Sequence, residues 1–336
     1  MTYVNVPVNA FRPFSLDRLC IVPDLVAAKH EFIFEGKKAI FSLPGLEKES
    51  VPYEQKRIVC RKWKSEGHVP LEYDVHSLDV EIEVEAPISV PEAIRHLHPN
   101  QSELLQTREQ ERLNKIVSET GAELHKAFAY WLRVLRWKSG IGYIGEPSVS
   151  YAGGHQSAGG AVLRERSTGH RMWLQGQTIF AIGNRPVTLD QWSATQGALA
   201  SGKTPPVWFD FLFDAEMRIN NNDLVGAVLS LAISLEVNVR FVFSHHLREA
   251  SIEPVIVEIF DQTNLRALLN RFKRMRDWSN DWAAATDFST FNSLMTHRDG
   301  VMHSAKTENL DARELRRMHA AVKTFAYFTC DVLGLS

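Results

Sequence analysis

The amino-acid sequence predicts an α+β protein, in which a mixed β/α domain over residues 1–205 is followed by an all-α helical bundle over residues 206–336. Three observations support this fold class. Apolar and polar residues alternate through much of the first hundred residues, which is the period of half-buried strands. Apolar residues then recur at threes and fours between Ser102 and Lys138. The same helical period returns in nearly all of the chain after Pro206.

Two segments of the first domain carry the clearest strand patterns. Residues 31–44, EFIFEGKKAIFSLP, place Gly-Lys-Lys between two apolar, aromatic arms, which predicts a hairpin. Residues 71–87 alternate through Leu78, Val80 and Ile82, which predicts a strand with one buried face.

A long helix is expected over residues 102–138, with an interruption at Gly121. A glycine-rich region with short strand-like pieces follows. The stretch TLDQWSATQGALASGKTPP then predicts a short helix that ends at Pro205 and Pro206. Because proline stops a helix, we place the domain boundary at this point.

Three helices are expected in the second domain. The first lies within residues 223–246 and carries one apolar stripe. The second, over residues 264–278, is apolar on one side and basic elsewhere. The last begins at Asp311, which has the acid Glu314 three positions later as in a capping box, and it ends at Gly334.

Composition excludes several classes of protein. Lys and Arg number 38 against 40 Asp and Glu, so a nucleic-acid partner would need a local basic patch. Cys20, Cys60 and Cys330 are far apart, which fits a reducing compartment and no thiolate zinc site. We see no signal-peptide pattern and no apolar run of about 18 residues. The expectation is a cytoplasmic protein with no membrane partner.

Two glycine-rich patterns match phosphate-binding motifs in their letters only. Residues 197–204 have the Walker A spacing, and residues 140–145 fit the dinucleotide fingerprint. Each follows a predicted helix rather than a strand, and proline interrupts any helix after it. We expect neither to bind a nucleotide. His155, in the glycine-rich loop AGGHQSAGG, is still a candidate ligand contact.

The paired histidines do not indicate a metal site. His96 and His98 are followed by Pro99 and lack nearby carboxylates, which weakens a metal interpretation. His245 and His246 lie near a helix end, where we expect contacts with terminal carbonyls. We therefore expect no metal and no cofactor.

Residues 296–306, THRDGVMHSAK, carry the strongest functional signal. Arg298, the polar Asp299 and His303 follow an Arg-polar-three residues-His pattern within a helical region. This pattern resembles HEPN domains, the helical RNases of bacterial toxin–antitoxin, CRISPR-associated and abortive-infection systems. The helix containing AVLSLAISLE and the amphipathic last helix are also similar, so the resemblance covers roughly residues 206–336. We recognise no family in residues 1–205.

The chemistry of these residue types is consistent with that resemblance. Cleaving RNA without a metal requires the 2′-hydroxyl to lose a proton and attack the neighbouring phosphate, and His303 can move that proton. Arg298 can hold the phosphoryl oxygens where charge builds. Asp299 lies four residues before His303, so it can orient the imidazole or the guanidinium of Arg298.

The spacing of Arg298 and His303 raises a geometric problem. Five positions correspond to about 140° on an ideal helix, so one straight helix would not aim both side chains at one phosphate. Either Arg298 lies in a non-helical first turn, which Gly300 would permit, or two subunits supply the site together. HEPN proteins resemble the second case, which implies a homodimer.

The resemblance also implies other site residues. Glu236 closes LAISLE, where related domains often carry a polar residue facing the cleft. The position two after His303, a modified tyrosine in one toxin branch, is Ala305, which makes that mode of silencing doubtful. A basic group next to Trp278 can bind RNA phosphates, or it can be a solvated helix face; its members are Arg271, Lys273, Arg274 and Arg276.

The leading hypothesis is a metal-independent endoribonuclease of prokaryotic antiphage defence, of the abortive-infection or toxin type. Its N-terminal domain would sense a phage or cellular trigger, or restrain the nuclease. Two alternatives stay open. One is a catalytically inactive HEPN-like module that dimerises or binds RNA, and the other is a nucleotide-sensing regulatory protein centred on the segment around His155.

Overall fold

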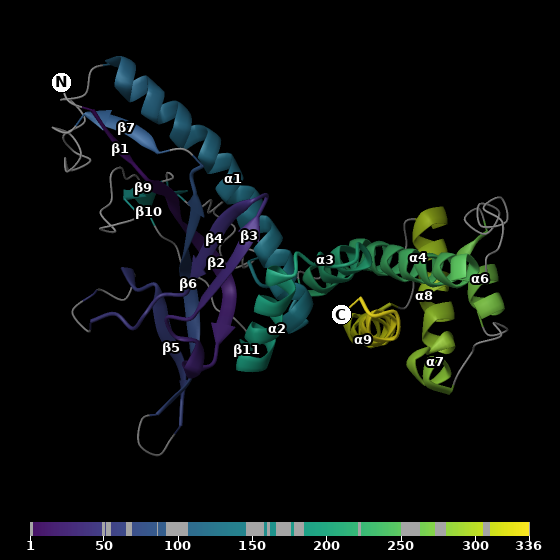
Figure 1. Ribbon diagram of the computed structural model, residues 1–336. Helices are drawn as coiled ribbons and strands as arrows, with labels where there is room; N and C mark the ends of the chain where they lie inside the picture. Colours follow the sequence, from purple (N-terminus) through teal and green to yellow (C-terminus); the bar gives the residue numbers. More distant parts are fainter. Residues whose placement is uncertain are drawn as a thin grey trace. The chain divides into compact units, whose positions relative to one another are not determined.

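The computed structural model divides the chain into two compact units, unit 1 (Met1–Thr204) and unit 2 (Pro205–Ser336). This division lies one residue before the boundary placed from the sequence. The described residues are 3–48, 51, 55–64, 69–85, 87–91, 107–145, 158–159, 162–165, 176–177, 185–220, 223–249, 263–272, 280–304 and 310–335. Strands and helices of unit 1 and helices of unit 2 make an α+β protein, so the predicted fold class is confirmed (Figure 1).

Within its described residues, unit 1 is built around a seven-stranded sheet. Five strands have the order β11-β2-β6-β4-β3, while β5 also pairs with β6 and β9 with β2. All pairs are antiparallel except β11 with β2. The strand bounds are β2 Val8–Ile21, β3 Lys29–Phe34, β4 Lys37–Ser42, β5 Ile58–Trp63, β6 Pro70–Glu83, β9 Val162–Glu165 and β11 Pro186–Val187. Two further pairs join β1 (Tyr3–Val6) to β7 (Ile88–Pro91) and β8 (Ala158–Gly159) to β10 (Gly176–Gln177).

Both clear strand predictions are confirmed. β3 and β4 form a hairpin whose turn has Glu35 and Gly36 at positive φ (48° and 82°), the conformation of a tight hairpin turn. The predicted alternation holds in the second half of β6, where Leu78, Val80 and Ile82 are buried.

Helix α1 (Thr107–Ser139) covers the sheet and closes the core of unit 1 (Figure 1). The ring of Phe128 stacks on Phe14 of β2 at 4.3 Å, and Trp131 stacks on Phe41 of β4 at 5.1 Å. The interruption predicted at Gly121 is wrong, because the helix runs through it. A glycine inside a helix costs about 1 kcal/mol, less than a buried apolar face of this length contributes.

The helix α2 (Leu189–Ala200) ends unit 1. Thr188 and Gln191 form a capping box at its start: Thr188 Oγ1 accepts from the Gln191 backbone N–H, and Gln191 Oε1 accepts from the Thr188 backbone N–H. The helix ends before Gly202, whose φ is +64°.

Within the described residues of unit 2, all regular secondary structure is helical. Its helices are α3 (Trp208–Asn220), α4 (Leu224–Glu249), α6 (Leu265–Phe272), α7 (Asn280–Ala285), α8 (Phe288–Ser304) and α9 (Ala312–Val332). The predicted cap of the last helix is confirmed, because the Asp311 carboxylate accepts from the Glu314 backbone N–H at 2.7 Å. The predicted stripe of α4 is buried, for example at Val228, Leu231 and Leu235, so α4 is a core helix.

The apolar character of α4 exceeds what the sequence analysis expected. By length and composition it is the one helix in the described ranges that could cross a membrane. More than half of its most apolar window is nevertheless buried inside the protein, as in the core helix of a soluble bundle.

Candidate functional site

Helix α8 carries the Arg-polar-three residues-His motif. Asp287 directly precedes the helix and caps it, because its carboxylate accepts from the Thr290 backbone N–H at 3.0 Å and from the Thr290 hydroxyl at 2.6 Å. These bonds lower the pKa of Asp287 and help to fix the start of the helix. The motif, residues 298–303, lies in the last turns of α8, which ends at Ser304. Of the two alternatives for the spacing of Arg298 and His303, the non-helical turn at Arg298 is wrong, because residues 288–304, Gly300 included, are all helical.

Arg298 lies on the side of α8 that faces the core. Phe291, Leu294 and Met295 are buried on this side, and Arg298 follows Phe291 by seven residues, or two helical turns. Its side chain is 37% exposed. The guanidinium is therefore held at the edge of the bundle rather than free in solvent.

The residues that the sequence selected on different helices converge at this edge. Glu236 Oε2 of α4 lies 3.9 Å from Arg298 Nη2, and Glu236 Oε1 accepts from Arg240 Nη2 at 2.7 Å. Asp299 lies 3.6 Å from Arg298 Nη1 and 3.3 Å from Arg266 Nη2 of α6. We call these five residues of alternating charge the arginine–carboxylate cluster.

The cluster holds Arg298 loosely. Both of its carboxylate contacts exceed the 2.7–3.2 Å of an N–H···O hydrogen bond. Partly exposed ion pairs of this kind contribute at most about 1 kcal/mol each to stability. Three guanidiniums face two carboxylates, so the cluster carries an excess of one positive charge. An anionic ligand can thus compete for Arg298 without dismantling a strong pair.

His303 is not brought to Arg298 within one chain. Both residues lie within α8, so in regular helical geometry their directions differ by about 140° and their positions by about 7.5 Å along the axis. His303 is exposed in the last turn. Of the two roles expected for Asp299, the contacts show the pairing with Arg298, and its other partner is Arg266 rather than His303.

The predicted RNA-binding group is only partly described. Arg271 is exposed in the last turn of α6. Lys273, Arg274 and Arg276 lie outside the described residues. Three of the histidines considered in the sequence analysis also lie outside the described residues: His96, His98 and His155.

Both declined phosphate motifs have the local structure expected of them. Gly197 lies inside α2, so the Walker A letters do not form a loop between a strand and a helix. Residues 140–145 are the turn after α1, where the Gly145 N–H donates to Asp17 O at 2.7 Å. A Cβ on Gly145 would lie 2.8 Å from a methyl of Leu132, which explains the glycine without a nucleotide.

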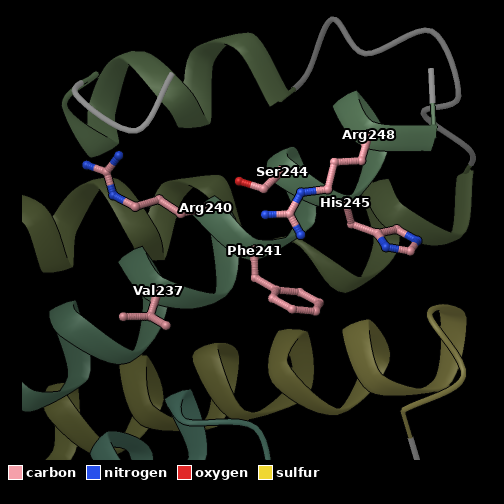
Figure 2. Close-up of a pocket in the computed structure, with 6 residues that line it drawn as sticks. All are labelled: Val237, Arg240, Phe241, Ser244, His245 and Arg248. Atoms are coloured by element: carbon pink, nitrogen blue, oxygen red, sulfur yellow. The ribbon is translucent and has the colours of Figure 1, made fainter. Parts of the chain in front are cut away.

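A hollow on α4 escaped the sequence analysis. Its volume is about 270 Å³, and Figure 2 shows the side chains that line it: Val237, Arg240, Phe241, Ser244, His245 and Arg248. The expectation that His245 contacts terminal carbonyls does not match its observed partners. His245 Nε2 lies 3.2 Å from Glu249 Oε1, and its ring is parallel to that of Phe241. The signal that could have revealed this hollow is the four-residue spacing of Val237, Phe241 and His245, which runs beside the buried stripe of α4.

In the described part of the chain, no group of three His, Cys, Asp or Glu side chains could hold a metal ion. Comparison of the chain with models of protein families, with characterised proteins and with solved structures gives no match.

Proposed function

We propose that this protein is a metal-independent endoribonuclease that acts as a homodimer, with RNA as its substrate and no cofactor. The observation that carries the proposal is the convergence of Arg298 with Glu236 of another helix at the edge of the bundle. By its resemblance to HEPN proteins, the enzyme would be a cytoplasmic effector of prokaryotic antiphage defence, with unit 1 as its sensor.

The reaction uses His303 and Arg298 in complementary roles. The neutral imidazole of His303 takes the proton of the ribose 2′-hydroxyl, and the 2′-oxygen attacks the adjacent phosphorus. The bond from phosphorus to the 5′-oxygen breaks, and the leaving oxygen takes its proton from the imidazolium of His303, which becomes neutral again. Arg298 binds the phosphoryl oxygens, where charge increases in the transition state. The products are a 2′,3′-cyclic phosphate and a 5′-hydroxyl end.

Two chains are needed because of the 140° between the side chains. In a twofold dimer, Arg298 of one chain and His303 of the other can meet at one phosphate. Asp299 and Glu236 would keep the guanidinium at the edge of the bundle until RNA replaces their long contacts.

The first experiment incubates the purified protein with total RNA in excess EDTA. The wild type should cleave, while His303→Ala and Arg298→Ala should lose on the order of 10²–10⁴-fold in rate, because each removes one catalytic group. Arg316→Ala is a matched control, since its side chain is exposed on α9 and belongs to neither the motif nor the arginine–carboxylate cluster. Undiminished cleavage by both catalytic variants contradicts the proposal.

A second experiment tests the sharing of the site between chains. His303→Ala and Arg298→Ala chains with different tags are co-expressed, and the mixed dimers are purified through both tags. If each site takes one group from each chain, the mixed dimer keeps one intact site and about half of the wild-type rate. Mixed dimers as inactive as the two parents would show that the groups do not act in trans.

A second candidate function is an RNA-binding module of the same fold without catalysis. The observation that favours it is the exposed His303, for which the described residues provide no carboxylate to orient the ring. Retained RNA binding with no cleavage by the wild type, in any metal condition, would support this candidate instead.

A further inference from the structure

The lining of the hollow on α4 consists of two parallel rows of side chains. Val237, Phe241 and His245 are spaced by four residues and form an apolar, aromatic row. Arg240, Ser244 and Arg248 have the same spacing and form a polar row beside it. Figure 2 shows the two arginine side chains on either side of Ser244, with the Phe241 and His245 rings beneath them.

The aromatic row offers ring surface that is already fixed in place. Phe241 is 39% exposed, although large apolar side chains on a core helix are usually covered. Its ring lies 5.0 Å from that of Trp208, which is buried, and 6.4 Å from that of His245 with only 9° between the planes. A flat ligand that stacks here would therefore meet rings of nearly the same orientation.

The polar row attracts anions. The two arginines are eight residues apart, which corresponds to about 12 Å along the helix. No carboxylate lines the hollow itself, although the Glu249 carboxylate lies 3.2 Å from Nε2 of the lining residue His245. Arg248 makes no ion pair within the part of the chain that the structure describes. Arg240 has Glu236 as its partner, so Arg248 supplies the stronger net attraction.

We propose that this hollow binds one base of a single-stranded nucleic acid, stacked on Phe241 and His245, with the flanking phosphates on Arg248 and Arg240. Ring surfaces interleaved with guanidiniums are the elements that proteins use to bind single strands. The volume of about 270 Å³ lies just below the range of small-molecule pockets, which fits one base better than a dinucleotide cofactor.

The position of the hollow connects it to the arginine–carboxylate cluster. Arg240 lines the hollow and also bonds to Glu236, which faces Arg298. Because Arg240 and Glu236 link the hollow to Arg298, a base bound in the hollow would help to set the register of the strand. Naming the strand as RNA rests on the proposed function, while the binding chemistry does not.

The test measures binding separately from cleavage. A fluorescein-labelled oligouridine of twelve nucleotides is titrated by anisotropy in EDTA, with full-length His303→Ala protein so that the probe stays intact. Phe241→Leu keeps an apolar side chain against Trp208 but removes the ring. We expect roughly 5- to 140-fold weaker binding, the equivalent of the 1–3 kcal/mol that a stacked base contributes.

Matched variants distinguish stacking from a general loss of structure. Phe241→Trp should restore or strengthen binding, since indole also stacks. Ile233→Ala lies on the same row of α4, is exposed and does not line the hollow, so it should bind like the parent. Equal binding by the Leu and parent proteins overturns the proposal. So does equal weakening in all three variants.

The arginine is tested through the salt dependence of binding. Losing one phosphate contact to a single strand lowers the slope of log K against log salt by about 0.7. Arg248→Ala should show this change, and Arg316→Ala should not. An unchanged slope in Arg248→Ala removes the phosphate contact from the proposal.

Two further results separate the hypotheses. Uridine monophosphate competing as well as the oligonucleotide would mean a nucleotide site rather than a strand site, and it would overturn the inference. Phe241-dependent binding without cleavage by the wild type would support the hollow and contradict the endoribonuclease. Cleavage that depends on His303, together with binding that does not change in Phe241→Leu, would support the endoribonuclease and contradict the base-binding hollow.

Discussion

His30 of β3 lies in the core of unit 1, where its two hydrogen bonds require the imidazole to be neutral. Its Nδ1 accepts a hydrogen bond from Trp131 Nε1 of α1 at 2.9 Å, and its Nε2 donates to the carbonyl of Trp192 in α2 at 3.0 Å. The ring also stacks on Trp192 at 3.7 Å and is 0% exposed. A proton on Nδ1 would face the N–H of Trp131, so protonation must disrupt this junction of three elements.

The sign and size of the effect follow from the pKa. Burial lowers the pKa of His30 from 6.5 to about 4, although the carbonyl of Trp192 opposes part of the shift. Between pH 4 and pH 6.5, the imidazole of His30 is therefore protonated in the unfolded chain and neutral in the folded chain. The contribution to stability is complete above pH 6.5 and is lost as the pH falls toward 4. The loss is on the order of 3 kcal/mol in total and about 2 kcal/mol by pH 5.

Urea unfolding followed by tryptophan fluorescence at pH 7 and pH 5 measures this loss. Other groups titrate over the same range, including His125, whose pKa is also lowered by burial and by Arg12. The decisive quantity is thus a difference: the loss between pH 7 and 5 should be about 2 kcal/mol smaller in His30→Gln than in the wild type. His125→Gln serves as the matched control. Equal pH-dependent losses in the wild type and His30→Gln would refute the reasoning.

Three other perturbations follow from single sites. Gly145→Ala should lower the free energy of unfolding by about 1–3 kcal/mol more than Gly36→Ala in thermal melts, since both have positive φ but only Gly145 would meet Leu132; equal effects would exclude the clash. Asn238 is buried and its amide has no hydrogen-bond partner in the described ranges, so Asn238→Leu should raise stability by about 1–3 kcal/mol. A loss on denaturant titration would reveal a hidden partner. Glu236→Gln should tighten RNA binding and slow cleavage by roughly tenfold, because it frees Arg298 but no longer positions it; faster cleavage would contradict that role.

Individual elements show which features of the fold can be predicted from residues that are close together in the sequence. The hairpin of β3 and β4, the buried stripe of α4 and the cap of α9 were all predicted, because each depends on residues within a few positions of one another. The break at Gly121 was wrong for the same reason. A local propensity of about 1 kcal/mol was overruled by the burial of α1 against the sheet, which the local pattern does not contain.

The sequence by itself determined the fold class, the order of most elements and the chemical types available for catalysis, an arginine and a histidine five residues apart. Only the tertiary structure decided that Arg298 meets Glu236, that Asp299 meets Arg266 rather than His303, and that α4 carries a hollow. Periodicity fixes which face of a helix is apolar, because that depends on the spacing of neighbours along one axis. It does not fix which helix that face packs against or at what offset, since these depend on the fit of side chains from distant segments.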